Sequence, residues 1–335
     1  MIGKRGGEEM ERRRDYGMDN LRGILILLVV FAHLLEICKP FPGSVFLYRT
    51  IYAFHMPAFL FLNGYFAKFD SKRILWNYLV PYVVFQTVYL FFDGWLNRAV
   101  TELQFTKPYW LLWYLLVCLF YHLLLPLYTV KSRRQRILAL GITFGLSLLA
   151  GYAEVLGYQL SMSRFFVFQP WFLLGYYSRK EKLLARMSGM DEIRKRFLQG
   201  LFAVAVCVLP LLMHLVRFPY GILYGSCSYE VLNYGPWERL FAGATALAWI
   251  GFGLLVLKPL LHWPLPMLTA LGQNTMSVFL LHGFVVRYIR HCQSGMLDTP
   301  MMVGLVTVLI LACCGNPMVG KAFRSLFSGK PILQK

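Results

Sequence analysis

Long apolar stretches, separated by short polar and basic segments, dominate the hydrophobic pattern of the chain. A helix that crosses the hydrocarbon layer needs about 20 largely apolar residues, with about 17–25 as the usual range. The pattern therefore predicts ten transmembrane helices, of which the sixth and tenth are short. The predicted spans are 21–38, 44–66, 74–92, 109–127, 137–156, 165–177, 197–215, 237–257, 270–286 and 301–314.

These spans predict an all-α fold, a polytopic membrane bundle of about ten helices. Residues 1–19 would be a charged N-terminal segment, residues 20–315 the membrane-embedded domain and residues 316–335 a C-terminal tail. The composition agrees, because 58% of the residues are hydrophobic and only 15% are charged. Soluble domains average about 45–50% apolar and about 25% charged residues.

The charge of the chain is strongly one-sided, with 34 Lys and Arg against 16 Asp and Glu and a formal net charge of +18. On an exposed soluble fold, this excess would suggest a nucleic-acid partner. Here 25 basic residues fall on one side of the predicted spans and 7 on the other, with Arg49 and Arg239 inside spans. Basic residues favour cytoplasmic loops. The pattern therefore predicts two cytoplasmic termini in a bacterial inner or plasma membrane, with membrane lipids and no nucleic acid as partners.

Three histidines fall within predicted spans, where an ionisable side chain is costly and is a functional candidate. His33 and His55 lie near the middle of the first and second spans, and His282 slightly beyond the middle of the ninth. The alternative is that each is a neutral imidazole bonded to a neighbouring helix. These histidines come from separate spans and no CxxC cysteine pair is present, so we expect no metal site.

Arg22 and Glu36 add polar groups to the helix that carries His33. Arg22 precedes His33 by eleven residues, which is about 16 Å of helical rise and three turns, so both lie on nearly the same face. Glu36 follows His33 by three residues and could orient the imidazole. Arg22 could instead be an interfacial anchor. Lys72 and Arg73, before the third span, fit either phosphate binding or the general cytoplasmic excess of basic residues.

Several short motifs occur together in a specific order. The chain resembles the membrane proteins of acyltransferase family three, whose first helix has an Arg-x10-His signature that Arg22 and His33 match. In the second helix, Asn63 stands where that family usually has Ser. Lys72-Arg73 replaces the family's more usual Arg-x-x-Arg. The motifs that carry the resemblance are Asp19–Ile24 with His33, Phe54–Phe59 with Asn63–Tyr65, Pro81–Tyr82, Trp110–Leu115, Phe168–Gly175 and Leu271–Ser277 with His282.

The resemblance implies a ten-helix enzyme that moves an acetyl or other acyl group from acyl-CoA to a hydroxyl of an extracytoplasmic glycan or related molecule. The donor, expected to be acetyl-CoA, would place its phosphates near Arg22, Lys72 and Arg73. His33 would act as the general base toward the acceptor hydroxyl, or form an acyl-histidine intermediate. The residues expected to contact substrate, or to stabilise the developing oxyanion, are His55, Asn63, Tyr65, Asn274 and His282.

Two other classes of protein remain open from the sequence. A transporter or flippase of a glycan or lipid intermediate could use the same histidines as a proton relay. A membrane scaffold without a site would tolerate changes at Arg22 and His33 except for their effect on stability. Acyl-CoA binding separates the enzyme from both. The acceptor is open as well, since exopolysaccharide, lipopolysaccharide, peptidoglycan, a periplasmic glucan and a small metabolite all fit.

Overall fold

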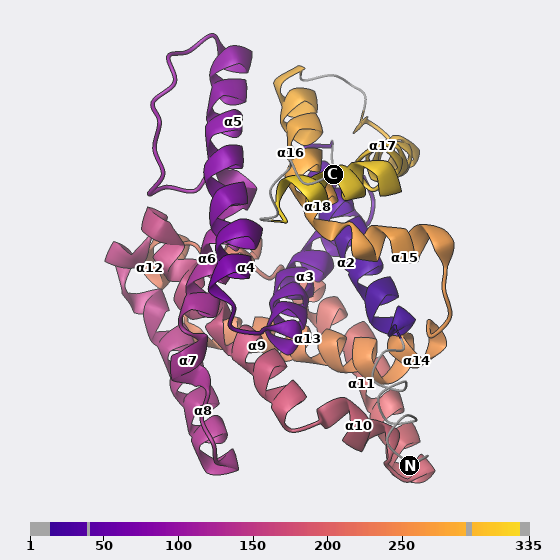
Figure 1. Cartoon of the computed structure of the whole chain (residues 1–335). Helices are drawn as coiled ribbons and strands as arrows, with labels where there is room; N and C mark the ends of the chain where they lie inside the picture. The colour runs from indigo at the N-terminus through magenta and orange to yellow at the C-terminus, as the bar shows by residue number, and fades with distance from the viewer. Residues whose placement is uncertain (1–13, 39–40, 293–296, 329–335) are drawn as a thin grey trace, which may run out of the picture.

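The computed structural model describes residues 14–38, 41–292 and 297–328. Helices joined by turns and loops make up these residues, and no β-strand occurs among them (Figure 1). The predicted all-α class is therefore confirmed.

Each of the ten predicted spans overlaps a helix of the structure. Six helical stretches have the length and hydropathy to cross a membrane on their own, or seven if α17 and α18, bent by 52°, count as one. The number of ten crossings is thus not confirmed. The overlapping helices are α2 (Tyr16–Leu35), α3 (Ser44–Phe66), α4 (Ser71–Ile74) continued by α5 (Val80–Asn97), α6 (Trp113–Leu123), α8 (Arg133–Leu149), α9 (Met162–Lys180), α11 (Glu192–Leu215), α13 (Pro236–Phe252), α16 (Thr275–Cys292) and α17 (Pro300–Cys314).

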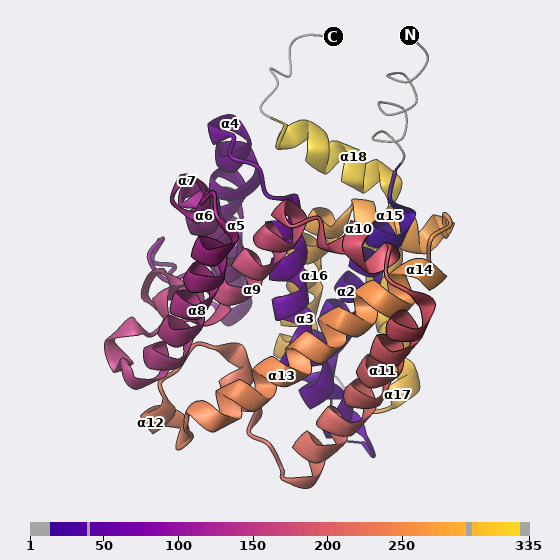
Figure 2. The same cartoon turned by 90° about the horizontal axis from the view of Figure 1, so that it is seen from below.

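Shorter helices complete the two ends of the molecule. They are α7 (Leu125–Tyr128), α10 (Leu183–Ser188), α12 (Tyr229–Leu232), α14 (Lys258–Leu260), α15 (Pro266–Gln273) and α18 (Pro317–Leu326). Figure 2 shows α4, α15 and α18 at the end of the molecule where the described residues begin and end, whereas α12 lies toward the opposite end. We call these the terminal end and the distal end.

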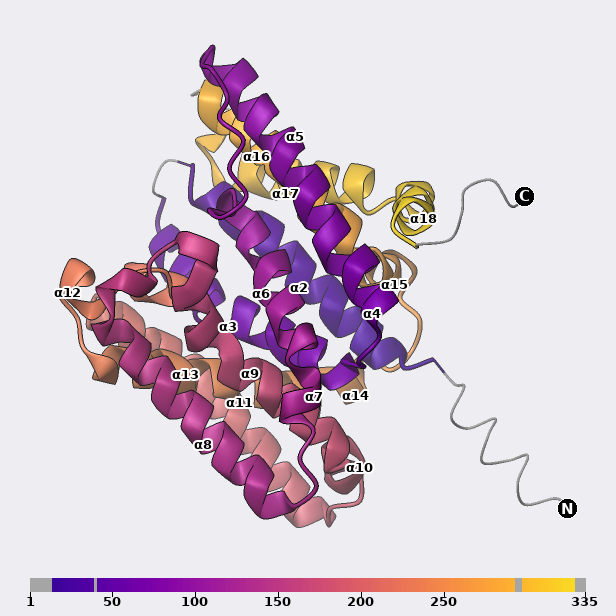
Figure 3. The same ribbon diagram turned by 60° about the vertical axis from the view of Figure 1, so that its left-hand side comes forward.

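Helices α2 and α3 form the centre of the bundle (Figure 3). In their most apolar stretches 67% and 61% of the residues are buried, against 17% for α11. Helix α3 packs against α9 and α13, while α2 packs against α15, α16 and α17. The outer helices instead expose large apolar side chains, such as Leu138 on α8 and Phe197 on α11. Lipid contact explains this exposure, because apolar side chains are stable in hydrocarbon.

Pairs of glycines allow the central helices to approach their neighbours closely. A Cβ atom on Gly64 of α3 would lie 1.9 Å from the carbonyl oxygen of Phe172, and one on Gly175 of α9 would lie 1.9 Å from that of Phe61. The α2–α15 contact repeats this arrangement, with a Cβ on Gly272 falling 1.8 Å from the carbonyl oxygen of Asp19. Small residues at such crossings are typical of membrane helices, which associate by close packing.

The α3–α9 crossing yields a first prediction. Gly175→Ala is expected to lower the melting temperature of the protein in detergent by several degrees, because overpacking costs about 1–3 kcal/mol and the obstructing atom is backbone. Gly141→Ala on α8 is the matched control, since its Cβ would meet nothing within 4 Å. Equal melting temperatures for the two variants would contradict the packing argument.

The segment expected to be a tail is partly structured. Helix α18 begins at Pro317, and the side chain of Asn316 accepts a hydrogen bond of 2.8 Å from the backbone N–H of Met318. The chain bends by 52° between α17 and α18, so α18 lies across the terminal end (Figure 2). It thereby brings Phe323 and Arg324 to the wall of an internal cavity.

Candidate active site

Arg22 and His33 lie at different depths of the bundle on the same helix, α2. The side chain of Asp15 caps α2 by accepting a hydrogen bond from the backbone N–H of Met18 at 3.1 Å. Since α2 starts at Tyr16 and ends at Leu35, His33 lies in its last turn and not at mid-span. The prediction that placed His33 near the middle is thus wrong. The eleven-residue separation still leaves Arg22 about 16 Å nearer to the terminal end.

Three neighbouring cavities lie along α2 between these two depths. The arginine vestibule, of about 530 Å³, is lined by Arg14, Arg22 and Arg324 among others. The middle cavity, of about 510 Å³, shares six lining residues with it, and the histidine cavity, of about 270 Å³, contains His33. Val29, Met56 and Phe279 line both the middle and the histidine cavities. The three spaces therefore follow one another from the terminal end of α2 to its distal end.

His33 is hydrogen-bonded to His282 of α16. The Nδ1 atom of His33 lies 2.9 Å from Nε2 of His282, and the two ring planes differ by 3°. Nδ1 of His282 lies 2.9 Å from the carbonyl oxygen of Val278. A carbonyl can only accept, so His282 donates from Nδ1, and in the neutral imidazole its Nε2 must then accept from His33 Nδ1–H. This chain of hydrogen bonds leaves the lone pair on Nε2 of His33 available as a base.

The two histidines differ in their access to the cavity. His33 lines the histidine cavity and keeps 8% of its surface exposed, whereas His282 is 0% exposed and does not line it. The ring of Trp110 packs on His33 with centroids 4.7 Å apart. His33 is thus accessible from the cavity, and His282 lies behind it.

Glu36 and His55 also line the histidine cavity, but neither is hydrogen-bonded to His33. Glu36 accepts a hydrogen bond from the hydroxyl of Tyr52 at 3.2 Å and forms an ion pair with Arg290 at 3.2 Å. His55 uses Nδ1 to donate to the carbonyl oxygen of Ile51 at 2.8 Å. The orienting contact that the sequence assigned to Glu36 is therefore made by His282.

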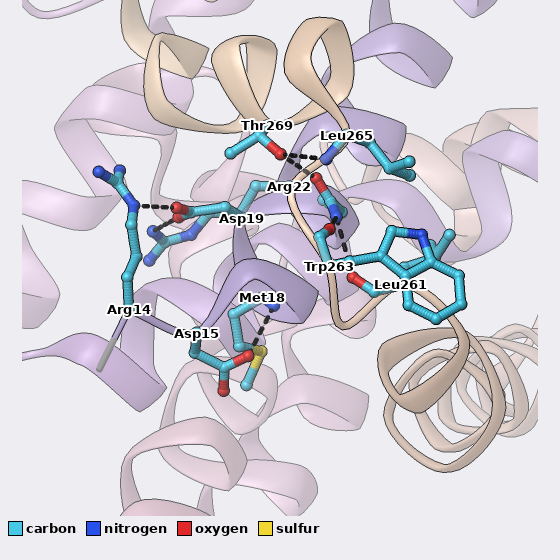
Figure 4. A network of polar contacts seen from close by, with 10 residues as sticks. Arg14, Asp15, Met18, Asp19, Arg22, Leu261, Trp263, Leu265 and Thr269 are labelled. Atoms are coloured by element: carbon cyan, nitrogen blue, oxygen red, sulfur yellow. Dashed lines mark hydrogen bonds and ion pairs between the residues drawn. The ribbon is translucent and has the colours of Figure 1, made fainter. Parts of the chain in front are cut away.

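The arginine vestibule contains more positive than negative charge. Asp19 is the one acidic residue among the described residues that line it, and it pairs with Arg14 at 2.7 Å and with Arg22 at 3.8 Å (Figure 4). The guanidinium of Arg22 also lies 4.2 Å from the centroid of the Phe66 ring. Arg324 of α18 donates to the side-chain oxygen of Asn274. Three guanidinium groups facing one carboxylate form a basic cleft suited to a phosphorylated ligand.

Asn20 fixes the position of α2 beside this vestibule. Its side-chain amide donates to the carbonyl oxygens of Leu261 and Trp263, each at 2.9 Å, and its oxygen accepts from the hydroxyl of Thr269 at 2.7 Å. Figure 4 shows its partners Leu261, Trp263 and Thr269 near the Arg14–Asp19–Arg22 cluster. Asn20 is 0% exposed, and its hydrogen bonds join α2 to α15 and to the segment before it.

The remaining predicted substrate residues lie outside the histidine cavity. Asn63 lines both the vestibule and the middle cavity, where its amide donates to the hydroxyl of Tyr78 at 3.1 Å and its buried oxygen has no partner among the described residues. Asn274 lines the middle cavity. Tyr65 lines none of the three cavities, and its ring packs against Phe61 and Phe66.

Lys72 and Arg73 lie on α4, at the terminal end (Figure 2). Neither lines the arginine vestibule. Arg73 pairs with Asp70 at 3.2 Å, and both residues of the basic pair are exposed. The structure therefore places them on the same end as Arg22 but not in contact with its cavity.

Three arginines that line the cavities were not identified as site residues from the sequence. Arg14 precedes the first apolar stretch, Arg324 lies in the presumed tail, and Arg164 comes immediately before the sixth predicted span. Each was counted only toward membrane orientation. The available signal for Arg324 was the pattern of Phe323, Arg324 and Phe327 after Asn316-Pro317, which is typical of a capped amphipathic helix.

A family model described as an acyltransferase domain matches residues 15–315. This range contains every helix from α2 to α17, and α18 lies beyond it. No curated protein and no solved structure matches the chain.

Proposed function

Because the chain belongs to acyltransferase family 3 and is therefore a membrane acyltransferase, we propose that it acylates an extracytoplasmic hydroxyl with an acyl group from cytoplasmic acyl-CoA. The expected donor is acetyl-CoA, and the acceptor is a glycan or a related cell-envelope molecule. The observation that supports this proposal is the series of three cavities between Arg22 and His33. In this proposal the terminal end faces the cytoplasm, as the excess of basic residues indicates.

The arginine vestibule would bind the phosphates of the donor. Arg14, Arg22 and Arg324 offer guanidinium groups that can form paired hydrogen bonds with phosphate oxygens. Lys72 and Arg73, outside the vestibule, would contribute a weaker attraction over a longer distance, which salt screens. The middle cavity would hold the flexible arm that carries the thioester toward His33, between Asn63 and Asn274 on one side and Met56 on the other.

His33 would act as the general base. Its Nε2 accepts the proton of the acceptor hydroxyl while the hydroxyl oxygen forms a bond to the thioester carbonyl carbon. The carbon–sulfur bond then breaks, and the proton passes from His33 to the departing thiolate, leaving the acyl ester and free CoA. In the alternative, Nε2 itself attacks the carbonyl and the acyl group passes from His33 to the acceptor.

Acetyl-CoA binding tests this proposal against a transporter. Titration of the purified protein is expected to show saturable binding of acetyl-CoA, with a dissociation constant at least tenfold higher in Arg22→Gln, because a hydrogen bond to a charged group contributes about 1.5–3 kcal/mol. The control is the double variant Lys72→Gln with Arg73→Gln, at the same end of the molecule. Its dissociation constant for acetyl-CoA is expected to rise less than that of Arg22→Gln. Absence of acetyl-CoA binding to the unsubstituted protein would refute the proposal.

A further inference from the structure

Arg164, in the first turn of α9, projects a cation into the histidine cavity. Its Nε donates to the carbonyl oxygen of Tyr224 at 3.0 Å. The guanidinium carbon lies 5.0 Å from the ring centroid of Trp113 and 5.4 Å from that of Tyr158. All three aromatic residues line the same cavity. The side chain is thus held by its Nε and by two ring faces, which leaves the two terminal nitrogens without a described protein partner.

Arg164 lacks an acidic partner among the described residues, unlike two arginines of α16. Arg287 pairs with Asp93, and Arg290 pairs with Glu36 at 3.2 Å. None of the described carboxylates forms an ion pair with Arg164, although its side chain is partly buried. An unpaired charge is costly to bury, so this cation would be stabilised by an anion that enters the cavity.

Arg164 and Arg239 have similar surroundings but differ in the size of the cavity beside them. Arg239 also lies over an aromatic ring, that of Tyr229, and bonds to the carbonyl oxygen of Ser147. The cavity beside Arg239 is only about 50 Å³, however, whereas that beside Arg164 is about 270 Å³ and contains His33. A space near 50 Å³ suits a water molecule, and only the larger one can admit part of a sugar.

We propose that Arg164 binds an anionic group, a carboxylate or a phosphate, of the acceptor whose hydroxyl reaches His33. This inference rests on the proposed function and narrows its acceptor to an acidic one. The two free nitrogens of the guanidinium can form paired hydrogen bonds with either anion. Trp113 and Tyr158 would hold the guanidinium in position and offer ring faces to a sugar. The negative charge thereby selects and orients the acceptor, and His33 performs the chemistry.

Titration with simple probes tests this assignment. The full-length protein in detergent would be titrated with methyl β-D-glucuronide, with glucose 6-phosphate and, as the neutral counterpart, with methyl β-D-glucoside. At least one anionic probe is expected to bind more tightly than the glucoside, and which one binds distinguishes a carboxylate from a phosphate. Arg164→Gln is expected to weaken that binding at least tenfold, because it keeps a long polar side chain but removes the charge.

Two variants control for structure and for the loss of a positive charge elsewhere. Ser163→Ala removes a hydrogen bond of 2.8 Å from α9 to the carbonyl oxygen of Gly225, next to the Arg164 contact, without removing charge. Arg133→Gln removes an exposed arginine of α8 that lines none of the three cavities. Both should bind the probe as the unsubstituted protein does. The proposal fails if neither anion binds preferentially, if Arg164→Gln binds normally, or if either control loses binding. A parallel acetyl-CoA titration shows separately whether the proposed function itself fails.

Discussion

Replacing His33 with alanine is expected to reduce acyl transfer at least 100-fold while leaving acetyl-CoA binding nearly unchanged. General base catalysis contributes about 10²–10⁴ in rate, and His33 lines the cavity while its Nε2 has no hydrogen bond to a described residue. The measurement is the transfer of labelled acetyl groups from acetyl-CoA to cell-envelope glycans in membrane vesicles, normalised to the amount of protein. The same result is expected if His33 carries the acyl group, and a labelled histidine in the quenched reaction would identify that case.

His122 provides the matched control for this experiment. It is a buried histidine of α6 whose Nδ1 donates to a backbone carbonyl, that of Cys118, at 2.9 Å, but it lines none of the three cavities. His122→Ala should therefore affect stability more than transfer. If His33→Ala transferred acetyl groups as fast as the unsubstituted protein, His33 could not be the general base. An equal loss of transfer in both variants would show instead that buried histidines are needed in general.

The helices were predictable because an apolar run of membrane length can form few stable structures other than a helix in the bilayer. The positions of the helix ends were less predictable. Helix α2 starts at Tyr16, five residues before the predicted span, because Asp15 caps it and the polar residues Asp19 and Asn20 are buried against neighbouring segments. Helix α9 is likewise longer than the predicted span 165–177, since it begins before Arg164 and ends at Lys180. Hydropathy alone treats such buried polar residues as the end of a span.

The candidate site was predictable only where it lies on one helix. The relation between Arg22 and His33 follows from helical periodicity. The His33–His282 hydrogen bond joins residues 249 positions apart, and only the packing of α2 against α16 brings them together. Arg324 enters the vestibule because the chain bends by 52° after α17. A sequence read one segment at a time contains neither contact, which is why the sequence assigned to Glu36 the orienting contact that His282 makes.

His282 is expected to act through His33 and not on the substrate. His282→Ala should lower kcat at least tenfold with little change in the KM for acetyl-CoA, because His33 then loses the acceptor that fixes its Nδ1–H tautomer. His282→Gln should recover part of kcat, since a glutamine oxygen can accept the same hydrogen bond. Ser277→Ala on the same helix is the control, because it removes contacts to Asn274 and Cys314 without affecting His33.

Comparison of these variants separates positioning from structure. If His282 only stabilised the fold, His282→Gln would recover no more activity than His282→Ala, and kcat would follow the amount of folded protein in each. If His282 instead donated to the oxyanion, it would need a free N–H toward the cavity, but its two ring nitrogens are bonded to Val278 and His33. Recovery of kcat by glutamine at constant KM would therefore show that His282 determines the tautomer of His33. The tautomer in turn places the catalytic lone pair on Nε2.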